Sequence, residues 1–233
     1  MAHYHCHVSS LGPDKSAAKT AAYICRVAGY AHRDEHAVET YAFNIPSFAK
    51  NATDFFAKSD MHERVNACRG KHFNIALPNG YDHASIAAEI VRPFVLMGLP
   101  ILAAVHDKPG NKHLHILVSE RMQDDYTRSL DADQFFKRAS QKKDGTRTGG
   151  ARKTRDLSNN RDWLMAFRRH VAESINFYVA EADKVDHRSH LARGLDRLPE
   201  RHRGPAGHQN QTRHKSTWHV PSACKMSMLS CLG

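Results

Sequence analysis

Strand-like and helix-like patterns of hydrophobic residues alternate along the chain. Residues 3–9 alternate in polarity, and short segments of strand length cover His72 to Leu77, Ile101 to Val105 and Leu114 to Val118. We expect each segment to form a β-strand. Residues 30–50 show neither period clearly and are expected to be irregular.

Apolar positions at helical spacing predict helices between these strands. The expected helices are Lys15 to Ala28 (closed by Gly29), Asn51 to Cys68, Asp82 to Met97 (interrupted or kinked near Pro93), Asp131 to Ser140 and Asn160 to Ala182. Beyond residue 186 the chain is rich in His, Arg, Gly and Pro, and we expect little regular structure there. This order predicts an α+β domain with a mostly antiparallel sheet and helices on one face.

A Pro-Gly-Asn turn separates the last two predicted strands and predicts a β-hairpin. Side chains alternate faces along a strand, so His113 and His115 point the same way. If the hairpin closes around residues 107–112, His106 lies opposite His113 on that face. Three imidazoles with one position left open suit a divalent metal that also touches a substrate. The alternative is chance spacing, because the chain has 18 histidines.

The composition indicates a folded protein without membrane spans. The chain has 233 residues, of which 41% are hydrophobic, and no apolar stretch approaches the roughly 20 residues of a membrane helix. The segment from Met1 to His5 lacks the basic start and apolar run of a signal peptide, so we expect a cytoplasmic location. The five cysteines are widely spaced and form no Cys-x-x-Cys pair, which argues against a disulfide framework and a zinc ribbon.

The net charge of +10 predicts a polyanionic partner, most often nucleic acid. Residues 141–155 hold six basic residues and three glycines, and we expect this segment to be mobile and to bury no core. It is interpreted as a clamp on a phosphate backbone, and the alternative is a solvated loop. The basic side chains assigned to DNA in this run are Lys142, Lys143, Arg152, Lys153 and Arg155.

A tyrosine on the first predicted helix is a candidate nucleophile. Tyr23 lies three or four residues from Lys19 and Arg26, which places it on a basic side of the helix. A free phenol is a poor nucleophile at neutral pH, whereas nearby cations favour the phenolate and attract phosphate. A tyrosine and a three-histidine metal site together suit attack on a DNA phosphodiester. The alternative is a tyrosine that packs or faces solvent.

Several motifs in order along the chain resemble the MobA/MobL-type plasmid mobilisation relaxases of the HUH endonuclease superfamily. They are Tyr4-His5-Cys6, Lys19-Thr20-Ala21-Ala22-Tyr23-Ile24, Arg33-Asp34, Ile75-Ala76-Leu77-Pro78, His106 with His113-Leu114-His115, Ser119-Glu120-Arg121, Val185-Asp186-His187-Arg188-Ser189, Arg197-Leu198-Pro199 and His202-Arg203-Gly204-Pro205. An ordered set of this kind is more specific than any single motif.

The resemblance implies a five-stranded antiparallel sheet with flanking helices, a relaxase domain over residues 1–206 and an irregular basic tail over 207–233. It implies that Tyr23 attacks one phosphodiester at a plasmid transfer origin, forms a 5′-phosphotyrosine link and later reseals the strand. The implied ligands of Mg²⁺ or Mn²⁺ are His106, His113 and His115. The implied partners are DNA, accessory mobilisation proteins and a secretion-system coupling protein, with export to the recipient cell on the DNA.

Two positions depart from the family pattern. His72 and Asn74 stand where the family usually has glutamates, so His72 becomes the candidate to accept a proton or to orient a ligand. Two further interpretations stay open: a rolling-circle replication initiator or transposase, and a DNA-binding protein with a decayed active site. His3 and His7 are interpreted as strand residues without a metal role, and His5 as lying near the floor of the site.

Overall fold

The structure is a computed structural model that describes residues 4–31, 36–107, 110–157 and 160–196. The chain divides into two units, residues 1–187 and residues 188–233. The first unit holds the sheet and its helices, and the described part of the second holds the 3-10 turn Leu191–Arg193. The expected boundary at residue 206 and the tail from 207 onward lie outside the described residues.

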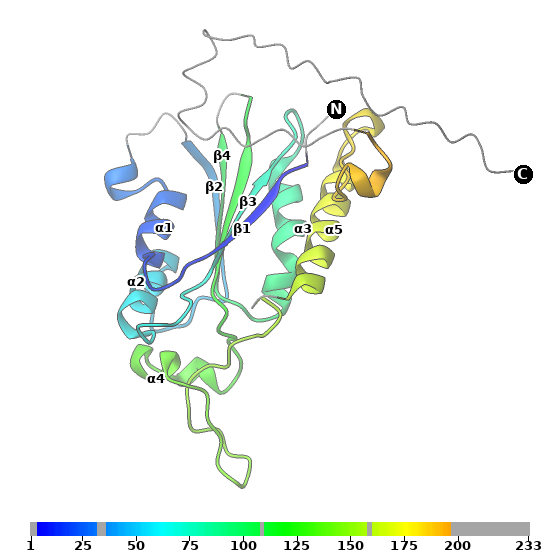
Figure 1. The fold of residues 1–233 in the computed structure, drawn as a ribbon. Helices are drawn as coiled ribbons and strands as arrows, with labels where there is room; N and C mark the ends of the chain where they lie inside the picture. The colour runs from blue at the N-terminus through cyan, green and yellow to red at the C-terminus, as the bar shows by residue number, and fades with distance from the viewer. Residues whose placement is uncertain (1–3, 32–35, 108–109, 158–159, 197–233) are drawn as a thin grey trace, which may run out of the picture. The chain divides into compact units, whose positions relative to one another are not determined.

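The first unit is built on one antiparallel sheet of five strands (Figure 1). The strand order is β1-β3-β5-β4-β2, so β5 is central and β1 and β2 form the edges. The expected five-stranded antiparallel sheet is confirmed. The strands are β1 (Cys6–Ser10), β2 (His36–Phe43), β3 (Lys71–Ala76), β4 (Ile101–Asp107) and β5 (His113–Val118).

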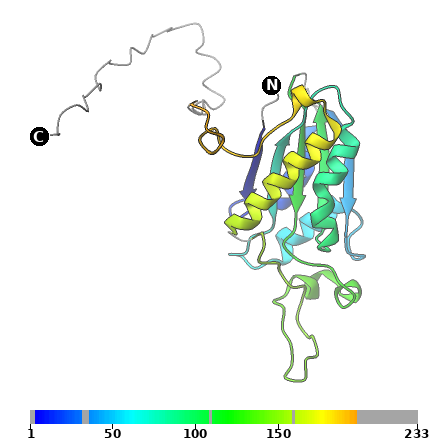
Figure 2. The same ribbon diagram turned by 90° about the vertical axis from the view of Figure 1, so that its right-hand side faces the viewer.

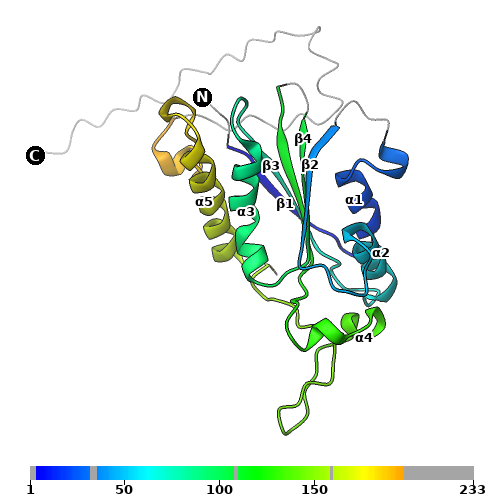
Figure 3. The ribbon, with the colours of Figure 1, turned by 180° about the vertical axis from the view of Figure 1, so that it is seen from behind.

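Helices cover both faces of the sheet, so the prediction of helices on one face was wrong. The helices α1 (Ala17–Ile24) and α2 (Ala52–His62) lie on one face, while α3 (His83–Leu96) and α5 (Arg161–Tyr178) lie side by side on the other (Figures 1, 2 and 3). The short α4 (Ala132–Phe136) lies beyond one end of the sheet. The continuous apolar run of β4 explains this arrangement, because its alternate residues supply two separate cores.

Polar caps fix where the five α-helices begin. In each case a side-chain oxygen of the residue before the helix accepts a backbone N–H of the first turn, which otherwise has no partner. The capping residues of α1 to α5 are, in order, Ser16, Asn51, Asp82, Asp131 and Asn160.

The helix α3 continues through Pro93, where the sequence predicted an interruption or a kink. A proline inside a helix leaves the carbonyl four residues earlier without its N–H donor. Here that carbonyl belongs to Glu89, and Nε2 of His170 on α5 donates to it at 2.8 Å. Packing of α5 against α3 therefore supplies the hydrogen bond that Pro93 removes.

Several other elements also differ from their predicted ranges, including α4, which ends at Phe136, and α5, which ends at Tyr178. Residues 36–43 form the edge strand β2, although residues 30–50 were expected to be irregular. The helix α1 ends at Ile24 rather than near Ala28, and α2 ends at His62 rather than at Cys68. Pairing with β4 defines the strand β2. At the two helix ends, the carbonyl of Ile24 accepts from His106 and the carboxylate of Glu63, which follows α2, accepts from Arg121.

Candidate active site

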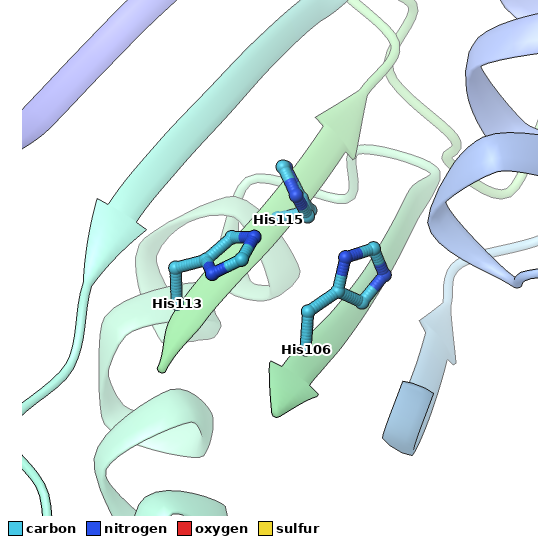
Figure 4. A group of neighbouring side chains, drawn as sticks. All are labelled: His106, His113 and His115. Carbon is cyan, nitrogen blue, oxygen red and sulfur yellow. The ribbon is translucent and has the colours of Figure 1, made fainter. Parts of the chain in front are cut away.

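Three histidines converge on the face of the sheet that α1 and α2 cover (Figure 4). His106 lies near the end of β4, and His113 and His115 lie on β5. His106 and His113 are direct partners in the β4–β5 ladder, as the hairpin predicts. One ring nitrogen from each of the three lies within 4.8 Å of the others, and all three residues are buried.

Backbone carbonyls fix the proton position on two of the rings. Nε2 of His106 lies 2.7 Å from the carbonyl oxygen of Ile24, and Nδ1 of His113 lies 2.8 Å from that of Asn111. A carbonyl can only accept, so these two nitrogens carry the protons. In the neutral form of each ring, Nδ1 of His106 and Nε2 of His113 therefore keep the lone pair that a metal ligand needs.

His72 on β3 contacts the third ring. Its Nε2 lies 2.9 Å from Nδ1 of His115, and the two rings stack with centroids 5.0 Å apart. Burial and the neighbouring histidines lower the pKa of His72 to about 4 and that of His115 to about 2, so both rings are neutral at pH 7. The structure thus places His72 behind His115, where it can orient that ring.

The donor set fits a divalent cation. Nε2 of His115 is buried and has no hydrogen-bond partner among the described residues, which is costly for a polar atom. When Nδ1 of the neutral ring donates to His72, Nε2 keeps a lone pair that a cation can use. The two acidic residues nearest the motif pair elsewhere: Asp107 lies 3.3 Å from Lys112, and Glu120 lies 3.5 Å from Lys71. Neither belongs to the histidine group. The residues that could hold a metal are therefore three imidazoles, with no carboxylate in the group found in the described part of the chain.

The helix α1 brings Tyr23 onto this group. The centroid of its ring lies 5.7 Å from that of His106 and 5.4 Å from that of His115, both edge-on. The helix approaches closely because it buries Ala17 and Ala21, which have small side chains. The tyrosine and the three histidines, far apart in sequence, therefore form one site.

A carboxylate of α2 holds the start of α1 in place. Asp60 accepts the backbone N–H groups of Ala17 and Ala18 at 2.9 and 3.0 Å and the hydroxyl of Ser16 at 2.6 Å. A negative charge at a helix N-terminus is favourable, because the unpaired N–H groups there carry a partial positive charge. This anchor fixes the register of α1, and with it the position of Tyr23, against the sheet.

The C-terminal end of α1 positions Arg26. The N–H of Val27 donates to the carbonyl of Ala22 and that of Arg26 to the carbonyl of Tyr23, the two bonds of a Schellman motif. Arg26 is the residue of this motif in the left-handed conformation, with φ +53°, where glycine is usual. Its guanidinium carbon lies 4.4 Å from the Tyr23 ring centroid, and Nη2 lies 3.0 Å from Nδ1 of His106. Arg26 therefore carries backbone strain next to Tyr23 and His106.

The other residues assigned to DNA lie in different places. Lys19 is exposed on α1. Lys142 and Lys143 are exposed on a short hairpin, closed by a bridge between residues 141 and 147, that extends from the end of the sheet opposite the three histidines (Figure 1). Arg152 and Arg155 are also exposed. The six residues of β5 alone span about 20 Å, so this hairpin lies far from Tyr23.

Lys153 is a structural residue rather than a free cation, which corrects the prediction of a segment that buries nothing. Its Nζ lies 3.0 Å from Glu63 and donates to the carbonyl of Cys68 at 2.6 Å. Arg121 donates to the same Glu63 at 2.6 Å and to backbone carbonyls, including those of Phe135, Lys137 and Ala151. Ala151 is itself part of the core. The base of the basic segment is therefore fixed to the body.

Sequence reasoning missed several groups of the site. Tyr30 packs edge-on against Tyr23, with centroids 5.6 Å apart, and no motif singled it out. The carbonyls of Ile24 and Asn111, which fix two histidine tautomers, carry no signal in side-chain type. His5 and His7 are exposed and stack on each other, and His3 lies outside the described residues.

The MobA/MobL family matches residues 15–213 of the 233. The chain belongs to this family. It is 32% identical over 215 residues to Mobilization protein A of Escherichia coli, a match that covers 88% of this chain and 30% of that protein. It is also 32% identical over 219 residues to the 43 kDa relaxation protein of Salmonella typhimurium, covering 84% and 56%. The chain thus spans less than two thirds of these relatives.

The fold of this MobA/MobL chain is similar to that of a chain from "Molecular Basis of Vancomycin Resistance Transfer in Staphylococcus aureus". The TM-score is 0.53 at 15% identity, and the match covers 84% of this chain and 96% of that chain. Among the described residues, no helix has the length and apolar character needed to cross a membrane.

Proposed function

We propose that this chain is a relaxase, which cuts one DNA strand at a plasmid transfer origin, holds it covalently and rejoins it. The observation that carries the proposal is the contact of Tyr23 with His106 and His115, a nucleophile beside a set of metal ligands. Membership in the MobA/MobL family and the names of the two relatives support the same role. We assign the tyrosine as the nucleophile because its ring meets the metal ligands rather than solvent alone.

In the proposed reaction the phenol oxygen of Tyr23 attacks the scissile phosphorus. The bond from phosphorus to the 3′ oxygen breaks, the 3′ oxygen leaves as a hydroxyl, and a 5′-phosphotyrosine remains. The proton lost by the phenol and the proton gained by the leaving oxygen balance. The reverse attack by a 3′-hydroxyl restores the strand and frees the tyrosine. Arg26 places a positive charge beside the ring, where it favours the approach of a phosphate.

Mg²⁺ or Mn²⁺ held by His106, His113 and His115 would polarise a phosphate oxygen and stabilise the charge of the transition state. The chain contributes the rest: carbonyls that orient two rings, and His72 that supports the third. His72 acts on the ligand His115, so we assign it a positioning role rather than that of a general base.

Basic residues, exposed except for the half-buried Arg26, provide the proposed contacts to DNA. Lys19 and Arg26 lie on or next to the helix of the nucleophile. Lys142, Lys143, Arg152 and Arg155 lie toward the far end of the sheet, so the DNA they contact is flanking DNA rather than the scissile bond. Contacts to phosphate supply affinity without choice of sequence. The proposed partners beyond DNA are accessory mobilisation proteins and a coupling protein of a secretion channel.

A covalent-adduct assay tests the proposal. The protein is incubated with supercoiled plasmid carrying its origin, or with single strands tiling that origin, and with Mg²⁺ or Mn²⁺. We expect an SDS-resistant protein–DNA band that needs the metal and disappears in Tyr23→Phe. Tyr30→Phe is the matched control, because this neighbour packs on Tyr23 and should keep the band.

Each outcome decides between the open interpretations. A band that persists in Tyr23→Phe and disappears in Tyr30→Phe would show that Tyr30 is the nucleophile and would contradict the assignment of Tyr23. Intact DNA binding with no adduct on a verified origin would favour a DNA-binding protein with a decayed site. An adduct formed at a replication origin rather than at a transfer origin would favour a rolling-circle initiator or a transposase.

A further inference from the structure

The guanidinium of Arg26 contacts Nδ1 of His106, the ring nitrogen that would bind a metal. The proton on Nε2 of His106 is committed to the carbonyl of Ile24 at 2.7 Å, so only Nδ1 can act as a ligand. Nη2 of Arg26 donates to this nitrogen at 3.0 Å. The same lone pair cannot accept from a guanidinium and bind a cation at once.

The guanidinium cannot give way by losing its proton. Arginine stays charged throughout the pH range of a folded protein, so its only ways to release Nδ1 are rotation of the side chain or movement of the backbone. Its positive charge also repels a divalent cation at this distance. Both effects oppose metal binding while Arg26 stays where it is.

The backbone shows that this position of Arg26 is imposed by the fold. The residue has φ +53°, a conformation that side chains other than glycine adopt at a cost, and the Schellman bonds at the end of α1 hold it there. From this position the side chain reaches both Tyr23 and His106. A glycine would satisfy the helix end with less strain and would leave Nδ1 uncovered.

We propose that Arg26 is a positioning residue that occupies Nδ1 of His106 until a divalent cation replaces it. The proposal rests on the metal site of the proposed function. In the metal-free protein the guanidinium substitutes for the cation and keeps His106 in the orientation of a ligand. Metal loading moves Arg26 off Nδ1 while its guanidinium keeps its contact with the ring of Tyr23, so that occupancy of the metal site and the exact position of the positive charge beside the nucleophile are coupled.

Calorimetric titration of the protein with Mn²⁺ alone, without DNA, tests the proposal. Arg26→Met keeps the apolar length and removes the donors, and Arg26→Gly removes the side chain and relieves the strained φ. We expect both variants to bind Mn²⁺ about tenfold more tightly than the unaltered protein, the effect of removing one competing charge-assisted hydrogen bond. Circular dichroism confirms that each variant is folded.

Two control variants test whether the increase in Mn²⁺ affinity comes from the contact between Arg26 and His106. Lys19→Met removes one positive charge from the same helix at an exposed position and should bind Mn²⁺ like the unaltered protein. His106→Gln removes the ligand and should weaken binding strongly. A tighter affinity in Lys19→Met equal to that in Arg26→Met would reduce the effect to net charge and overturn the proposal.

The side chain itself provides a second measurement. In protein labelled with ¹⁵N at arginine, the Nε resonance of Arg26 should shift when diamagnetic Mg²⁺ is added, and the shift should be absent in His106→Gln. Equal or weaker Mn²⁺ affinity in both Arg26 variants overturns the proposal while leaving the metal site standing. Absence of binding in the unaltered protein and in both variants overturns the metal site of the proposed function as well.

Discussion

The ring of Tyr23 meets the ring of His115 edge-on, with centroids 5.4 Å apart, and so joins the first helix to the central strand of the sheet. Small residues on both sides make this approach possible. Ala17 and Ala21 are two of the three buried residues of α1, and Ala104 lies opposite His115 in the β4–β5 ladder. The site therefore depends on the small side chains around it as much as on its polar groups.

Replacement of His72 tests its role behind His115. We expect His72→Ala to weaken Mn²⁺ binding about 10-fold to 100-fold, because loss of a group that orients a metal ligand has an effect of this size. His72→Glu, which restores the residue type usual in the family, should bind at least as tightly as the unaltered protein. Calorimetric titration measures both affinities.

His7→Ala is the matched control for this experiment. His7 is an exposed histidine on β1 and stacks on His5 rather than on the metal ligands. We expect its replacement to leave the affinity for Mn²⁺ unchanged. An equal loss in His7→Ala and His72→Ala would contradict a specific role for His72.

Replacement of the exposed cations of the basic segment should reduce the salt dependence of DNA binding. We expect the combined change of Lys142, Lys143, Arg152 and Arg155 to alanine to lower the slope of log K against log salt. The decrease should be about 0.7 for each phosphate that the variant no longer neutralises on single strands, or about 0.9 on duplex. Fluorescence anisotropy at several salt concentrations measures the slope.

A matched four-charge variant separates this segment from net charge alone. It changes to alanine four exposed basic residues outside the segment: Lys50, Arg92, Arg169 and Lys184. We expect its salt slope to stay closer to that of the unaltered protein. Equal slopes in the two variants would show that the segment contributes only its share of the total charge.

The buried ion pair of Arg121 and Glu63 should contribute strongly to stability, because it joins the end of α2 to residues 134–151. Arg121→Met leaves Glu63 buried without its main partner, and we expect a loss of about 3–5 kcal/mol in the free energy of unfolding. Urea denaturation measures this loss. Hydrogen exchange should also rise in residues 134–151, because Arg121 donates to the carbonyls of Phe135, Lys137 and Ala151 in this segment. An exchange pattern like that of the unaltered protein would contradict this role.

The same pair predicts a loss of stability in acid. Burial raises the pKa of Glu63, but hydrogen bonds from Arg121 and the charge of Lys153 outweigh it, so the pKa lies below its ordinary value. A group whose pKa is lower in the folded state stabilises the fold above its unfolded pKa of about 4.3 and loses that contribution as the pH falls through the folded pKa. The free energy of unfolding should therefore fall between about pH 5 and pH 3, and fall less in Glu63→Gln. Parallel curves for the two proteins would contradict this assignment.

The sequence predicted those parts of the fold that depend on local pattern. The register of the β4–β5 hairpin follows from the alternation of side chains about a short turn, and it places His106 opposite His113 as expected. The sequence did not reveal β2, because this edge strand has a weak apolar pattern and is defined by its pairing with β4. Nor did it show that α3 continues through Pro93, since the compensating donor comes from α5.

The sequence by itself therefore determined the three clustered histidines, the candidate tyrosine and the antiparallel sheet, because each is encoded by spacing along one or two adjacent elements. Only the tertiary structure decided that Tyr23 meets the histidines, that Arg26 lies on Nδ1 of His106, and that Lys153 is held by Glu63. These relationships depend on the packing of α1 on the sheet and on hydrogen bonds between distant segments. Such contacts are set by three-dimensional packing, which has no period in the sequence.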